Sequence, residues 1–102
     1  MSDGMNFESV TVDNTVGGVA LSSSEFAPGA DMPADRAFIT VETAQIRFTY
    51  DGTAPTTTLG HLADPGDVVK LDSPQSIKNF RAIRTGGVSA SLMVSYENGQ
   101  EI

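Results

Sequence analysis

The chain has 102 residues, of which 39 % are hydrophobic, contains no cysteine and carries a formal net charge of −7. This length suits one domain, and the lack of cysteine excludes a scaffold held by disulfides. The acidic balance disfavours partners such as nucleic acid or an anionic membrane, and no apolar run approaches the roughly 20 residues that cross a bilayer.

Side chains alternate between apolar and polar in seven short runs, and no amphipathic helix of ten or more residues is evident. Alternation with a period of two indicates strands with one buried face. The runs cover residues 7–12, 16–22, 37–43, 45–50, 67–71, 80–85 and 90–96. The sequence therefore predicts an all-β domain, a small antiparallel β-sandwich or jelly roll of about six to eight strands.

Turn residues separate these runs. Asp51-Gly52 follows a strand directly, and residues 64–67 (DPGD) match a type II turn with Gly66 in the left-handed region. Gly86-Gly87 joins two alternating runs, which predicts a tight hairpin. Ser73 followed by proline predicts a single helical turn through Asn79.

The N-terminal third differs in charge from the rest of the chain. Residues 1–35 contain six acidic side chains and no lysine or arginine, a net charge of −6, and residues 23–36 have the composition of a long loop. We therefore expect an acidic N-terminal arm and loop over residues 1–36 and a sandwich core over residues 37–102, in a single domain overall. Three isolated apolar residues of the arm are expected to dock on a neighbouring subunit or on the shell of an assembly: Phe7, Phe26 and Met32.

The N-terminus also lacks the basic and apolar segments of a secretory signal, so we expect the protein in the cytoplasm or in a particle assembled there.

Two groups of side chains could take part in catalysis or binding. His61 lies close to Asp64 and Asp67, a set that could bind a metal or transfer a proton, but both aspartates occupy turn positions. We therefore expect His61 to be structural, hydrogen-bonded locally between strands, and predict no catalytic, cofactor-binding or metal-binding residues. A metal-dependent enzyme using His61 is the less favoured alternative.

The second group is basic. Lys78, Arg81 and Arg84 form either a solvated strand edge or a partner-binding surface for an acidic neighbour, such as the N-terminal arm of another copy.

Four segments together resemble a pattern in small virion proteins of tailed bacteriophages: RFTYDGTAPTTTLGHL, PGDVVKL, IKNFRAIRT and ASLMVSYE, within residues 45–97. The resemblance implies a non-enzymatic β-sandwich that decorates or cements the outside of the capsid. It implies the major capsid protein and further copies of the same chain, for example in a trimer, as partners, with no nucleic acid and no membrane. Its location would be the head surface of a virion assembled in the host cytoplasm; a neck or tail position is the alternative.

A shorter stretch, FTYDGTAPT, is similar to a motif of immunoglobulin-like modules attached to glycoside hydrolases. That similarity implies the same sandwich architecture and a different role, a stand-alone module that binds a carbohydrate or a receptor.

Overall fold

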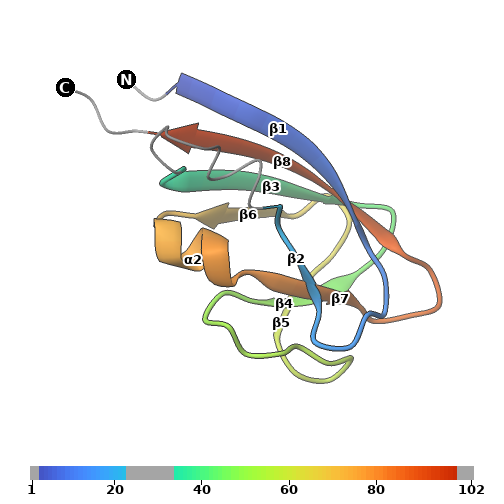
Figure 1. Ribbon diagram of the computed structural model, residues 1–102. Helices are drawn as coiled ribbons and strands as arrows, with labels where there is room; N and C mark the ends of the chain where they lie inside the picture. The colour runs from blue at the N-terminus through green and yellow to red at the C-terminus, as the bar shows by residue number, and fades with distance from the viewer. Residues whose placement is uncertain (1–2, 23–33, 99–102) are drawn as a thin grey trace.

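The computed structural model describes residues 3–22 and 34–98, which form two stacked antiparallel sheets of four strands each and one short helix (Figure 1). Sheet A contains, in spatial order, β1 (Asp3–Val12), β8 (Ala90–Asn98), β3 (Arg36–Glu42) and β6 (Val68–Leu71). Sheet B contains β2 (Val19–Ala20), β7 (Arg81–Arg84), β4 (Ile46–Thr49) and β5 (His61–Ala63). The predicted all-β sandwich is confirmed.

The core lies between the two sheets because one face of each strand is apolar. On β3, β4 and β8 the buried side chains recur at every second position, as the pleat of a strand requires. The largest fully buried side chains come from both sheets and from the helix: Tyr96, Phe80, Ile39, Ile46, Ile77 and Leu92. Alternation in the sequence thus places the buried set correctly on these strands.

The helix α2 (Pro74–Asn79) closes one end of the sandwich (Figure 1). Ser73 caps it, since the Ser73 hydroxyl accepts a hydrogen bond from the Ser76 N–H at 3.2 Å, and Pro74 takes the first helical position. Ile77 anchors the helix in the core. The predicted helical turn is confirmed, and no helix in the described part of the chain has the length and hydropathy needed to cross a membrane.

The turn at residues 64–67 carries the chain from sheet B to sheet A. The Asp67 N–H donates to the Asp64 carbonyl at 2.9 Å, and Gly66 has a φ of +97°, as expected for a type II turn. The Asp67 carboxylate also accepts from the Asp64 N–H at 2.8 Å. The edge strands β5 and β6 are thereby joined by a connection of only four residues.

The expected hairpin at Gly86-Gly87 is wrong. The two runs do form strands, but β7 belongs to sheet B and β8 to sheet A. The glycines therefore carry the chain across the sandwich. Alternation marks a strand and says nothing about which sheet it joins, since that depends on pairing with distant strands.

The N-terminal segment also differs from the expected arm. Strand β1 pairs with β8 from Asp3 to Val12, and Val10 and Val12 are buried in the core. Gly17 and Gly18 form a turn with positive φ instead of lying inside a strand, and β2 then joins sheet B. Residues 3–22 are thus part of the sandwich, whereas most of the expected loop, residues 23–33, lies outside the described residues.

The turn before β2 requires glycine at position 18. Gly18 has a φ of +85°, and a Cβ there would lie 3.0 Å from the Arg81 Cβ and from the Pro55 ring. We expect Gly18→Ala to lower the free energy of unfolding by about 2–4 kcal/mol in urea titration. Gly17→Ala is the matched control, since Gly17 has a φ of +91° but nothing within 4 Å, and should cost only about 1 kcal/mol. Equal losses of unfolding free energy in the two variants would show that the close approach of Arg81 and Pro55 to Gly18 adds nothing to the cost.

Candidate functional site

The outer face of sheet A is an open surface with apolar side chains. We define it by two rows of residues that lie side by side across the four strands. The first row runs across β1, β8, β3 and β6 as Phe7, Ser95, Phe38 and Lys70. The second row contains Ser9, Met93, Thr40 and Val68. No described helix or strand lies over these rows.

Three large apolar side chains of this face are exposed to solvent. Phe7 is 59 % exposed, Phe38 42 % and Val68 47 %. The Lys70 ammonium lies 5.8 Å from the centre of the Phe38 ring, within reach of a cation–π contact. The remaining positions of the two rows hold Ser9, Thr40, Met93 and Ser95, so the rows contain no carboxylate.

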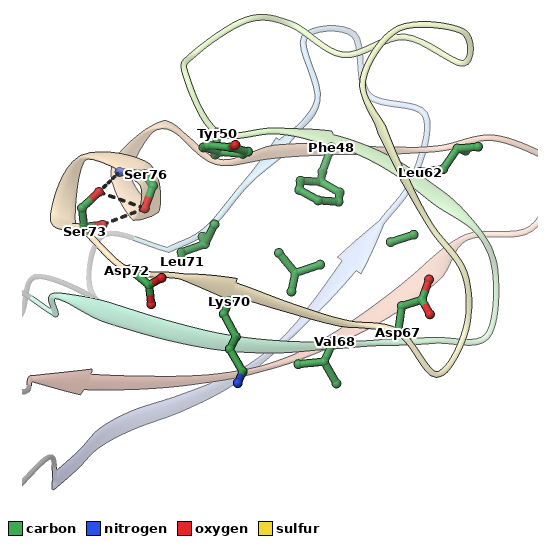
Figure 2. A pocket seen from close by; sticks show the side chains of 12 residues that line it. Phe48, Tyr50, Leu62, Asp67, Val68, Lys70, Leu71, Asp72, Ser73 and Ser76 are labelled. Carbon is green, nitrogen blue, oxygen red and sulfur yellow. Dashed lines mark hydrogen bonds between the residues drawn. The ribbon is translucent and has the colours of Figure 1, made fainter.

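A second feature is an open groove of about 620 Å³ between the edge strands β5 and β6 (Figure 2). Phe48, Tyr50 and Leu62 lie on its sheet B side, and β6 forms its sheet A side. Asp67 lies at one end of the groove, and Asp72 lies at the other end, next to the helix cap. The groove therefore combines an apolar wall with acidic ends.

His61 is the third member of a chain of aromatic rings. Phe80 stacks on Phe48 at 5.7 Å, Phe48 contacts His61 at 5.4 Å, and His61 stacks on Tyr50 at 5.7 Å between ring centres. The expected local hydrogen bond of His61 is not present among the described residues; its contacts are with rings. Within residues 3–22 and 34–98, no three acidic or histidine side chains are grouped to hold a metal ion.

Tyr50 and His61 also border a smaller hollow of about 450 Å³, together with Asp51 and Thr53. The Thr53 N–H donates to the Asp51 carboxylate at 3.0 Å. This hydrogen bond holds the pKa of Asp51 below its ordinary value, and the nearby His61 adds a smaller effect in the same direction.

Asp13 is held in a similar way, because the hydroxyl and the N–H of Thr15 both donate to its carboxylate and lower its pKa. A carboxyl whose pKa is lower in the folded state stabilises that state above its ordinary pKa. Both contributions are therefore present at neutral pH and are lost as the pH falls below about 4.

The threonine-rich stretch between β4 and β5 is anchored by one side chain of β4. The Arg47 guanidinium donates to the Thr57 carbonyl at 3.0 Å and to the Gly60 carbonyl at 2.8 Å. Pro55 is buried, and its ring faces the close approach at Gly18. The loop therefore folds onto sheet B and has a structural role there.

This anchor gives a second prediction. Arg47→Lys keeps the charge but loses the planar fork that reaches both carbonyls. We expect a loss of about 1–2 kcal/mol in unfolding free energy and faster hydrogen exchange at the Leu59 amide, which donates to the Thr56 carbonyl within the loop. Arg36→Lys, in sheet A, should leave Leu59 exchange unchanged, and an unchanged rate in Arg47→Lys would show that other contacts hold the loop.

The predicted basic surface is not formed. Arg81 packs beside Gly18 and Pro55, and Arg84 donates to Ser89 at 3.1 Å near Asp13. Lys78 is on the exposed surface of α2. These three cations are close together in the sequence. In the structure Lys78 lies on α2 and the two arginines lie on β7, so the side chains face separate parts of the surface.

Of the predicted apolar anchors, the structure describes only Phe7, which lies on the outer face of sheet A. Phe26 and Met32 lie outside the described residues. Phe38, Val68 and Met93 were not predicted as surface residues of an interaction face. A signal for Phe38 was present, because in residues 37–43 (AFITVET) it shares a face with the polar Thr40 and Glu42, opposite the apolar face of the strand.

Comparison of the chain with protein-family models, with curated proteins and with solved structures finds no match.

Proposed function

We propose that this protein is a structural component of a tailed-phage particle that binds the outside of the capsid shell and stabilises it. The observation that carries the proposal is the outer face of sheet A, where Phe7 of β1, Phe38 of β3 and Val68 of β6 are exposed on one face of the same sheet. The resemblance of residues 45–97 to small virion proteins supplies the kind of partner, the major capsid protein.

The chemistry of this face favours a protein partner. In an antiparallel sandwich the outer face usually carries polar side chains, and exposed apolar groups on neighbouring strands are typical of an interaction surface. Each large apolar side chain that a partner buries fully contributes about 1.5–3 kcal/mol to binding. The Ser and Thr hydroxyls around them can bond to a partner or to interfacial water at little desolvation cost.

The experiment is to purify particles from infected cells by density gradient and to quantify the chain by mass spectrometry. A ratio close to that of the major capsid protein supports a role on the head surface. A few copies per particle would instead support the neck or tail. Absence of the chain from intact particles would contradict the proposal.

A different class of function has one observation in its favour. Tyr50 is 48 % exposed and lies beside Asp51, Thr53 and His61 in the smaller hollow, and an exposed ring next to polar groups is the usual composition of a sugar-binding site. This supports the alternative of a stand-alone carbohydrate- or receptor-binding module. Binding to a soluble oligosaccharide panel that is lost in Tyr50→Ala would favour that alternative.

A further inference from the structure

We propose that the groove between β5 and β6 is a second binding site, which accepts an extended basic segment of a partner protein as an added strand beside β6. The inference goes beyond the proposed function, because it concerns a different surface and holds for a partner inside or outside a virion.

The backbone of β6 provides the first reason. The Val41 N–H donates to the Asp67 carbonyl at 3.0 Å, which identifies this position as a hydrogen-bonded pair of the β3–β6 ladder. Hydrogen-bonded pairs alternate with pairs whose N–H and C=O groups point the other way. Counting along β6, Val69 and Leu71 bond toward β3, while Val68 and Lys70 direct their backbone groups to the free edge. No described strand lies beyond this edge in sheet A.

The side chains around the groove provide the second reason. A strand added beside β6 would direct every second side chain between the sheets, toward Phe48 and Tyr50 (Figure 2). The other side chains would continue the outer face, next to Val68 and Lys70. The groove thus selects a segment with apolar residues at alternate positions, and the backbone bonds would supply affinity that does not depend on sequence.

Charge identifies the class of occupant. Asp67 and Asp72 lie at the two ends of β6, and neither forms an ion pair with a described side chain. The Lys70 ammonium lies over Phe38 on the outer face, but Lys70 also borders the groove, so the two carboxylates and this lysine give the lining a net charge of −1. The whole chain carries −7, so a second copy would be repelled, whereas a segment with lysine or arginine at its ends would be attracted.

The test uses the full chain, labelled with nitrogen-15, and a synthetic capped peptide of sequence KVTVTVK as the probe. We expect the peptide to shift the amide signals of β6 and to slow hydrogen exchange at the Lys70 amide. The peptide EVTVTVE should bind at least about threefold more weakly at low salt. Two further peptides carry methyl groups on alternate backbone nitrogens, one on the odd-numbered and one on the even-numbered residues. The N–H groups of a strand point alternately to its two sides, so only the peptide that keeps the N–H groups facing β6 should bind.

Two variants of the protein complete the test. Val68→Pro removes a backbone N–H that points to the free edge and leaves the bonds to β3, and it should weaken KVTVTVK binding at least about fivefold. Asp72→Lys changes an exposed side chain without touching the backbone, and it should weaken the basic peptide and strengthen the acidic one.

Three results would overturn the proposal. They are equal binding of the basic and acidic peptides, no change at the β6 amides with millimolar KVTVTVK, and concentration-dependent protection of Lys70 without peptide. The last result would show that a second copy occupies the edge. None of these results bears on the outer face of sheet A, so failure here leaves the capsid proposal to its own test.

Discussion

Phe80→Ala is expected to lower the free energy of unfolding by about 3–5 kcal/mol, the usual cost of removing a buried phenylalanine ring. Phe80 is buried, stacks on Phe48 at 5.7 Å between ring centres and joins α2 to β7. Its loss would therefore leave a cavity where the helix, β4 and β7 meet. Because a small domain has only about 5–15 kcal/mol of stability in total, the variant should be near its unfolding limit at 37 °C.

The measurement is urea unfolding followed by circular dichroism, with Phe38→Ala as the matched control. Phe38 is the same residue type but lies on the outer face of sheet A, half exposed, so its removal should cost less than about 1 kcal/mol. A cost for Phe38→Ala as large as that for Phe80→Ala would mean that the outer face of sheet A is buried within the free protein.

The second large effect concerns binding. The double variant Phe7→Ser, Phe38→Ser removes two exposed rings that lie in one row across sheet A. If a capsid shell buries both rings, the variant should bind particles at least about 100-fold more weakly, since each ring contributes about 1.5–3 kcal/mol. The measurement is co-sedimentation with particles that lack the protein, over a range of protein concentrations.

Tyr50→Ser is the matched control for this experiment, because Tyr50 is similarly exposed but lies at the groove between β5 and β6. The control should keep its affinity for particles. A loss in Tyr50→Ser with normal binding of the double variant would move the particle-binding surface from sheet A to the groove.

Local patterns in the sequence predicted the parts of the fold that depend on neighbouring residues. Alternation identified β3, β4 and β8 with their buried sides, and turn chemistry identified the capped helix at Ser73 and the type II turn at residues 64–67. These features follow from steric preferences and hydrogen bonds that act over a few residues.

Features that depend on distant pairing were not predictable in the same way. Strand β1 is held by β8, whose paired residues lie 78 to 95 positions away in the sequence, so an acidic N-terminus without a strong pattern was taken for an arm. The two strands at Gly86-Gly87 joined different sheets for the same reason. Arg81 and Arg84 are three residues apart on β7, and this odd spacing directs them to opposite faces of the strand, where one packs by Pro55 and the other bonds Ser89.

The outer face of sheet A could likewise be predicted only in part from the sequence. Phe7 was predicted as a partner contact because it is an isolated apolar residue, and the structure leaves its ring on the surface. Its neighbours Phe38, Val68 and Met93 come from three other strands, and only the cross-strand register brings them to one face. Whether that face binds a capsid stays a prediction.

Hydroxyl-radical footprinting of the protein, free and bound to purified particles, tests directly whether the outer face of sheet A binds the capsid shell. Phe7, Phe38 and Met93 report on the outer face of sheet A, and the exposed Leu59 of the anchored loop serves as the internal reference. We expect strong protection of Phe7, Phe38 and Met93 on particles and unchanged labelling of Leu59. Equal labelling of Phe7, Phe38 and Met93 in the free and particle-bound protein would contradict it.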